Sequence, residues 1–204
     1  MLNDKNARGS GVTDQGDLQL ILKLRQGDLE ALGGLYDRHR LLVYRTALAI
    51  TGDTEAAADL LHDTFLRLYR FGHRIDPTRP IEPWLYRMTA NMAYTWVKRR
   101  GRWHQALREM ADRLSREYPA SPSQQVERNE AWLEIRRALQ AISPEKRVVV
   151  VLYYLNDLPI SEIAEILDLP LGTVKSRLHY GRQALKQQLG LDGQVVPRVG
   201  YEAT

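Results

Sequence analysis

The stretch that decides the fold is Ile160–Leu185, ISEIAEILDLPLGTVKSRLHYGRQAL. Its first part repeats apolar side chains with the spacing of one helix face, at Ile160, Ile163, Ala164 and Leu167. The next residues, 168–171, have the composition of a turn. A second helix follows, and its apolar anchors are Val174, Leu178 and Leu185. This order of short helix, turn and longer helix predicts a helix-turn-helix.

The second helix of this motif is basic and contains no carboxylate between Gly172 and Leu185. The side chains left for solvent or DNA are Thr173, Lys175, Ser176, Arg177, His179, Tyr180 and Arg182. In DNA-binding motifs of this kind the second helix enters the major groove, where a carboxylate would repel phosphate. A solvated basic face on an ordinary helical hairpin is the alternative, and the preceding short helix and turn favour DNA binding.

Nearly all periodic stretches of the chain have helical spacing, which predicts an all-α protein. The stretch YPASPSQQ at 118–125 breaks this periodicity and has the composition of a flexible linker. We therefore expect two small helical domains, one at 17–117 and one at 126–190, the second containing the helix-turn-helix. Residues 1–16 are expected to form a disordered tail, and residues 191–204 a second tail.

The helix expected at 54–71 places Ala57, Leu60, Leu61, Phe65 and Leu68 towards a core. Its outer face carries Asp59, His62, Asp63 and Arg67, a mixture of charges that by itself is typical of a solvated surface. A proline-rich loop at 73–81 and a helix from Trp84 follow. These two segments combine basic side chains with Asn91 and Tyr94, which suits a single nucleic-acid strand. Trp84 and Tyr86 are expected in the core.

Composition excludes several classes of protein. The 204 residues carry a net charge of +4 and no cysteine, so disulfides and thiolate metal sites are excluded. No stretch approaches the ~20 apolar residues that span a bilayer, and we expect a soluble cytoplasmic protein without membrane insertion. No phosphate-binding loop, nucleophile elbow or dinucleotide fingerprint is present, so no catalytic residue, metal or cofactor is expected. Asp59 and Asp63, one turn apart, would be the metal ligands of a rival enzyme hypothesis.

Three stretches in order resemble the extracytoplasmic-function (ECF) sigma factors of bacterial RNA polymerase. They are AAADLLHDTFLRLYR (sigma region 2.2), PWLYRMTANMAYTWVKRR (regions 2.3 to 2.4) and LPISEIAEILDLPLGTVKSRLHYGRQAL (region 4). With the helices between them they cover roughly 17–189. The resemblance implies two helical domains, binding to core RNA polymerase, and recognition of two promoter elements called −35 and −10. It implies no catalysis by the chain itself.

The resemblance also assigns roles to individual residues. It implies polymerase docking by Asp59, His62, Asp63 and Arg67. It implies contacts with the opened −10 DNA by Arg74, Arg79, Arg87, Asn91, Tyr94, Lys98 and Arg99. In the −35 duplex it implies base contacts by Lys175, Ser176 and His179, and phosphate contacts or bracing of the helix by Thr173, Arg177 and Arg182.

The sequence departs from the family pattern at the recognition helix. Tyr180-Gly181 stands where Arg-Ala is usual, which removes one cation and should weaken the helix by roughly 1 kcal/mol relative to alanine. Pro159 and Pro170 replace capping serines and cannot supply a side-chain cap. A helix-turn-helix regulator that does not replace a sigma subunit remains the alternative function. Control by an anti-sigma protein and control by the tails are both open.

Overall fold

The computed structural model describes residues 14–114 and 130–191, and these parts are helical without a strand. The helices are α1 (Gln15–Arg25), α2 (Leu29–Thr51), α3 (Thr54–Phe71), α4 (Glu82–Leu114), α5 (Glu130–Ala141), α6 (Pro144–Tyr154), α7 (Ile160–Leu167) and α8 (Leu171–Leu189), with a 3-10 turn η1 (Gly72–Arg74). The all-α prediction is confirmed. The linker expected at 118–125 and nearly all of both tails lie outside the described residues.

Short polar residues begin the helices of the first half. Asp28 accepts hydrogen bonds from the backbone N–H groups of Glu30 and Ala31 at the start of α2. Asp53 accepts one from Ala56 at the start of α3, while Gly52 ends α2 in the left-handed conformation (φ 69°). Gly52 and Asp53 thus supply the end of α2 and the cap of α3. Asp14 caps α1 in the same way, and this helix begins at Gln15.

The helix-turn-helix forms as predicted from α7 and α8. Asp168 ends α7 in the left-handed conformation (φ 53°), which aspartate tolerates better than most residues. Pro159 and Pro170 precede α7 and α8 without a side-chain cap. Ile163, Val174, Leu178 and Leu185 are buried as expected, and Ile166 joins them. Ile160, Ala164 and Leu167 are half-buried against the same core.

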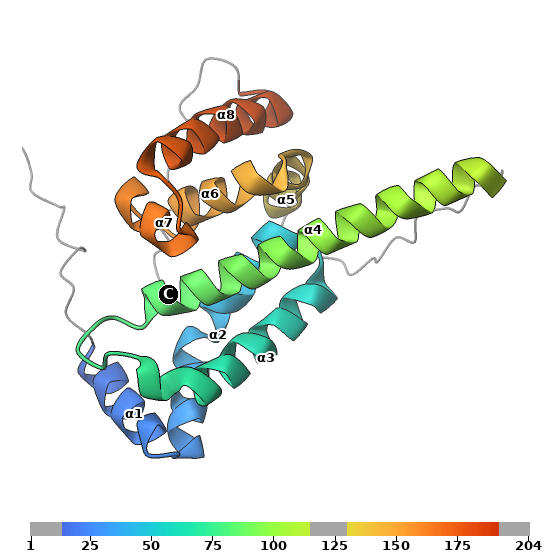
Figure 1. Cartoon of the computed structure of the whole chain (residues 1–204). Coiled ribbons are helices and arrows are strands. Elements are labelled where there is room, and N and C mark those ends of the chain that lie inside the picture. Colours follow the sequence, from blue (N-terminus) through green and yellow to red (C-terminus); the bar gives the residue numbers. More distant parts are fainter. Residues whose placement is uncertain (1–13, 115–129, 192–204) are drawn as a thin grey trace, which may run out of the picture.

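The two halves of the chain pack against each other. Helices α2 and α4 contact helices of the second half, namely α5, α6 and α7, and α4 lies between α1–α3 and α5–α8 in Figure 1. A single apolar cluster crosses the boundary and includes Ile50, Tyr86, Ala93, Val149 and Leu152. The sequence predicts two small domains joined by a linker, and the first half has a second cluster of its own, which includes Ile21, Leu35 and Phe65. The described parts of the two halves also share the first cluster, because apolar faces on both halves cover one another.

Arg147 is the charged residue of this shared core. It lies on α6 and is 5% exposed. Its guanidinium donates to the backbone oxygens of Gln140, Ile142 and Ile50, the last at 2.7 Å, and also to the side-chain oxygen of Gln140. Ile50 belongs to the end of α2, so Arg147 joins the first half to the second. Burial lowers the pKa of Arg147 to about 10.

Gly181 corrects one expectation from the sequence. It is buried where α8 crosses α6, and a Cβ atom at this position would lie 2.6 Å from Cγ2 of Val150. It would also lie 3.4 Å from the backbone oxygen of Lys146. Glycine therefore does not weaken this helix relative to alanine in the folded protein. It permits the close approach of α8 to α6, which its intrinsic helix propensity does not reveal.

We predict that Gly181→Ala lowers the free energy of unfolding by about 1–2 kcal/mol. Forcing a methyl group against the stiff side chain of Val150 costs more than the gain in helix propensity returns. Gly172→Ala on the same helix is the matched control, since nothing lies within 4 Å of its added Cβ. It should leave stability unchanged or slightly higher. Chemical denaturation followed by circular dichroism measures both, and a more stable Gly181→Ala protein would contradict the packing argument.

We predict that Arg147→Met lowers the free energy of unfolding by about 3 kcal/mol, because several buried carbonyl oxygens lose their donor at once. Arg136→Met is the control. Arg136 is half-buried and donates to the backbone oxygen of Gly52 at 2.9 Å, so its loss should cost about 1 kcal/mol. If urea denaturation shows that the two variants lose the same free energy of unfolding, Arg147 contributes no more to stability than Arg136 does.

Candidate nucleic-acid interface

The outer face of α8 is available to a ligand. Its side chains at Lys175, Ser176, His179, Tyr180 and Arg182 are exposed, while Thr173 and Arg177 are half-buried. The helix carries no carboxylate along its length. The structure therefore brings all seven residues of the expected −35 surface onto one helix, with the apolar anchors on the opposite side. A positive, exposed face of this size is suited to a nucleic-acid groove.

A cation from another helix lies beside Tyr180. The ammonium group of Lys146, on α6, is 5.7 Å from the centre of the Tyr180 ring, and the ring of His179 packs edge-on against the same tyrosine at 5.3 Å. Tyrosine at this position removes a cation from the helix itself. Lys146 supplies one from the neighbouring helix, a contribution that the sequence pattern does not indicate because the two residues are far apart in the chain.

A second polar face runs along α4. Arg87, Asn91, Tyr94 and Lys98 recur at intervals of three or four residues, which places them in one stripe. Arg87, Asn91, Lys98 and Arg99 are exposed, and Tyr94 is half-buried. Lys98 lies over the Tyr94 ring, 4.8 Å from its centre. This stripe offers cations, one amide and one aromatic ring, the groups that hold a single strand.

The loop before α4 is anchored by more than its prolines. Ile75 and Ile81, at its two ends, are buried. The Asp76 carboxylate accepts hydrogen bonds from the hydroxyl and backbone N–H of Thr78, at 2.7 and 3.0 Å, and these bonds hold the pKa of Asp76 below its usual range. Arg74 lies over the ring of Phe71, and Arg79 lies 3.6 Å from Asp76. The two arginines that this loop contributes to the expected strand surface are thus held near the start of α4.

Of the two aromatic residues of α4 expected in the core, Tyr86 is buried and Trp84 is half-buried. Tyr86 is 8% exposed, and its burial raises the pKa of its hydroxyl to about 12. Trp84 is half-buried against the core of the first half. Trp96 is half-buried too, with the guanidinium of Arg100 at 5.0 Å from its ring. Arg100 also pairs with Asp53 at the start of α3, which leaves Tyr94 as the ring of the exposed stripe.

The outer face of α3 carries the four residues of the expected docking surface. Asp59, His62, Asp63 and Arg67 are all exposed. Leu66 and Tyr69 are exposed beside them, by 58% and 42%, and the sequence analysis missed both. The sequence could have indicated them, because both are apolar residues that lie outside the buried stripe of a strongly amphipathic helix. Apolar contacts with a charged rim are typical of protein–protein interfaces.

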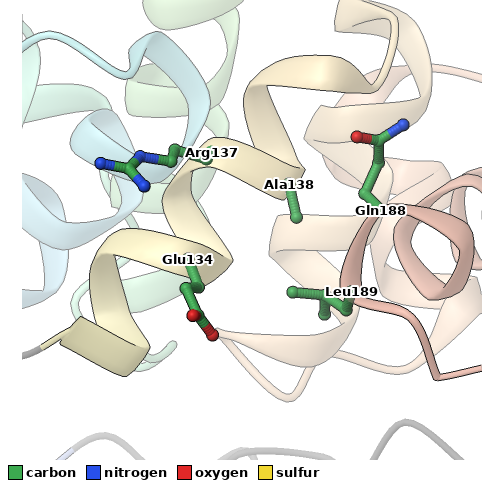
Figure 2. Close-up of a pocket in the computed structure, with 5 residues that line it drawn as sticks. All are labelled: Glu134, Arg137, Ala138, Gln188 and Leu189. Carbon is green, nitrogen blue, oxygen red and sulfur yellow. The ribbon is translucent and has the colours of Figure 1, made fainter.

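A shallow hollow between α5 and α8 has a volume of about 300 Å³. Figure 2 shows its lining residues, Glu134, Arg137 and Ala138 from one helix and Gln188 and Leu189 from the other. In Figure 2 the guanidinium of Arg137 points away from the other four side chains. None of the residues expected to contact DNA or polymerase lines it.

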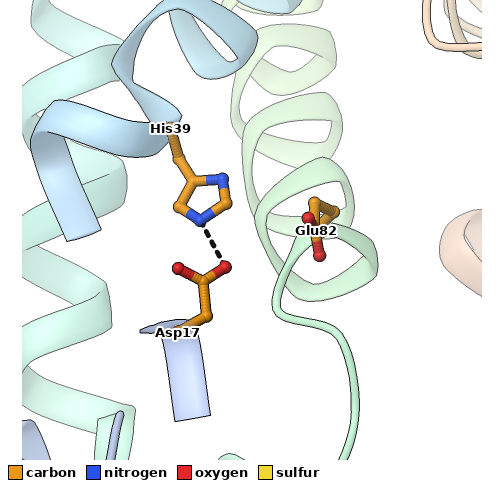
Figure 3. Close-up of side chains that lie close together, drawn as sticks. All are labelled: Asp17, His39 and Glu82. Atoms are coloured by element: carbon orange, nitrogen blue, oxygen red, sulfur yellow. Dashed lines mark hydrogen bonds and ion pairs between the residues drawn. The ribbon is translucent and has the colours of Figure 1, made fainter. Parts of the chain in front are cut away.

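One trio of possible metal ligands lies in the described part of the chain. Asp17, His39 and Glu82 approach one another from α1, α2 and α4, as Figure 3 shows. Asp17 and His39 are buried and joined by a hydrogen bond of 2.8 Å. Arg38 donates to the same carboxylate at 3.1 Å, and its fixed positive charge opposes a cation there. The trio therefore ties α1 to α2. Asp59 and Asp63, the ligands of the enzyme hypothesis, belong to no such group.

Comparison with known proteins identifies the family. A model of sigma-70 region 2 matches residues 35–102, and a model of sigma-70 region 4 matches residues 132–185. The chain is 34% identical over 165 residues to the ECF RNA polymerase sigma factor SigL of Mycobacterium tuberculosis. The matched segment covers 77% of this chain and 89% of SigL. The chain belongs to the ECF sigma factors. The two halves described above therefore correspond to regions 2 and 4 of this family.

Other ECF sigma factors are similar over much of the chain. SigE of Mycolicibacterium smegmatis is 38% identical over 156 residues, covering 76% of this chain but 60% of that longer protein. SigW of Bacillus subtilis is 28% identical over 176 residues, and the matched segment covers 83% of this chain and 94% of SigW. The structure of CnrH in complex with the cytosolic domain of CnrY has a TM-score of 0.62 at 22% identity and covers 88% of this chain and all of that one. It supports the fold.

The described helices include none that combines the length and apolarity required to cross a membrane.

We predict that Asp63→Arg weakens binding to core RNA polymerase by about tenfold, because a reversed charge repels its partner across an interface. His62→Ala should weaken binding less. Asp37→Arg is the control, since Asp37 is an exposed aspartate on α2 and not on α3. Binding is measured by fluorescence anisotropy of the labelled sigma factor. If all three variants bind polymerase as the unaltered protein does, the α3 face is not the docking surface.

Proposed function

We propose that this ECF sigma factor binds core RNA polymerase through α3, reads −35 duplex with α8, and holds the opened −10 strand with α4 and the preceding loop. It catalyses no reaction itself and acts in the cytoplasm, where the polymerase works. The observation that carries the proposal is the exposed, carboxylate-free face of α8 on a helix-turn-helix, in a chain that also matches sigma region 2.

Duplex recognition by α8 follows from the residues it exposes. Lysine pairs with guanine acceptors at the base edges, and serine hydrogen-bonds to several bases. Lys175 and Ser176 lie in the first half of α8, the part that enters the major groove in helix-turn-helix proteins. Arg182 lies two turns further along, where contacts with the phosphate backbone prevail.

Strand capture by α4 follows from a different set of groups. Bases become accessible to stacking only after the duplex opens, and a single backbone is held by cations spaced along a groove. The α4 stripe has Arg87 and Lys98 as cations, Asn91 for a base edge, and Tyr94 as a ring, and Glu145 contacts Tyr94 and Lys98 in this structure. The anchored loop adds Arg74 and Arg79 at the start of the same helix.

The alternative is a helix-turn-helix regulator that leaves the sigma subunit in place. Such a protein needs no docking face on its first half, whereas α3 exposes Leu66 and Tyr69 among charged residues. Relatives along most of the chain are named RNA polymerase sigma factors, which also favours the sigma function. RpoE of Bartonella quintana has been solved with the anti-sigma factor NepR. We propose a comparable inhibitory partner as one form of control of this chain.

The test is run-off transcription from a library of promoter fragments, using core RNA polymerase with and without the protein. The protein should direct transcription from a defined subset of fragments that core polymerase alone leaves silent. An unchanged set of transcripts would contradict the proposed function. A regulator of the alternative kind would alter transcription only when another sigma factor is also supplied.

We predict a division of labour along α8 in the same library. Lys175→Ala or Ser176→Ala should change which upstream sequences are preferred, by about 1–3 kcal/mol at the bases contacted. Arg182→Ala should weaken all sequences alike and reduce the salt dependence of binding by about one unit of slope. Unchanged base preference in both of the first two variants would rule out base reading by this part of the helix.

A further inference from the structure

Glu145 reaches from the second half of the molecule onto the α4 stripe. It lies in the first turn of α6. The hydroxyl of Tyr94 donates to its carboxylate at 3.2 Å, and the ammonium of Lys98 lies 3.5 Å from the same oxygen. Lys98 in turn lies over the Tyr94 ring. One carboxylate of region 4 thus engages two of the groups expected to hold the −10 strand.

The contact has the chemistry of a phosphate contact. One carboxylate oxygen faces both a cation and a hydroxyl, as an anionic oxygen of a backbone phosphate can. The backbone N–H at the start of α6, together with Tyr94 and Lys98, keeps the pKa of Glu145 below its usual range although burial opposes this. Glu145 is therefore ionised at neutral pH. The ammonium of Lys98 and the hydroxyl of Tyr94 likewise have a polar partner, the Glu145 carboxylate, in the absence of DNA.

We propose that Glu145 holds the two halves in a closed state by occupying the place of a DNA phosphate on Tyr94 and Lys98, so that closure and capture of the −10 strand exclude each other. This inference rests on the proposed role of the α4 stripe. It adds a form of control that resides within the chain.

Further polar contacts make the closed arrangement specific. The end of α2 exposes carbonyl groups, and region 4 supplies donors to them. Arg136 donates to Gly52 at 2.9 Å and Gln140 to Ala49 at 3.3 Å. The Asn156 side chain donates to the hydroxyl of Thr46 at 2.9 Å. Apolar burial alone would tolerate sliding of one half over the other, whereas these bonds define one position.

Promoter geometry requires the closed state to open. Elements centred at −35 and −10 are about 25 base pairs apart, which is about 85 Å of B-form duplex at about 3.4 Å per base pair. A compact body of about 160 residues is about 40 Å across. The two halves therefore cannot share a core and reach both elements of an undistorted promoter together. Opening would free Tyr94 and Lys98 at the same time.

The absence of cysteine makes the arrangement of the halves measurable in the full chain. Spin labels at Asp37→Cys on α2 and Gln187→Cys on α8 use two exposed positions outside the proposed contact surfaces. Double electron–electron resonance should give one short distance between the two spin labels in the protein that is otherwise unaltered. Glu145→Gln should add a longer-distance population, and Glu145→Lys should make it dominant because lysine repels Lys98. Core polymerase should lengthen the distance in every variant.

Strand capture is measured on the same proteins with a single-stranded oligonucleotide of the non-template −10 sequence. Glu145→Gln should bind it about fivefold more tightly, since affinity rises with the open fraction. Glu165→Gln and Glu165→Lys are charge-matched controls, because Glu165 is exposed on α7. They should leave the distance unchanged, and each should change strand affinity less than its Glu145 counterpart. Arg147 is unsuitable for this test because it also binds α5 within region 4.

Three results would overturn the proposal. The first is a long distance in the unaltered protein without polymerase. The second is a distance in the Glu145 variants that equals that in the Glu165 controls. The third is a Glu145 variant that shows the longer distance but binds the single-stranded oligonucleotide no more tightly than the corresponding Glu165 variant. If no protein binds the oligonucleotide even with polymerase, the α4 stripe does not hold the strand. The proposed function then fails separately, whatever the distances show.

Discussion

The arrangement of the molecule depends on the need to satisfy one buried guanidinium. Arg147 is almost inaccessible to water and remains charged at neutral pH, since its pKa falls only to about 10. Its donors meet backbone oxygens at the ends of α2 and α5, where helix ends carry partial negative charge. Moving α6 away from α2 would leave the carbonyl of Ile50 without this donor. The charge in the core therefore specifies the contact between regions 2 and 4.

The same contact divides the surfaces that the protein uses. The face of α8 points away from region 2 and stays exposed, so the −35 surface is available in this arrangement. The α4 stripe lies at the junction of the halves, and Glu145 covers part of it. The α3 face remains open on the other side of region 2. The docking and duplex-reading side chains are thus exposed in the closed state, whereas part of the strand-binding stripe is covered.

Buried polar groups also hold region 2 together. Asp17 is 3% exposed and accepts from His39 and Arg38, which ties the first turn of α1 to the middle of α2. Such a group is costly to bury without partners and stabilising with them. The sequence pattern does not indicate this pair, because the partner of His39 lies 22 residues earlier and on another helix. Periodicity within one helix carries no information about such a pair.

The helices, the helix-turn-helix and the exposed faces of α3, α4 and α8 can be predicted from the amino-acid sequence, because side-chain direction within a helix follows from spacing alone. Which faces meet depends on the tertiary structure. It placed Lys146 beside Tyr180 and Glu145 on Tyr94, a pair 51 residues apart. It also made Gly181 a packing requirement. These features depend on how helices cross, and the crossing is set by the sum of contacts from both halves, which no local pattern contains.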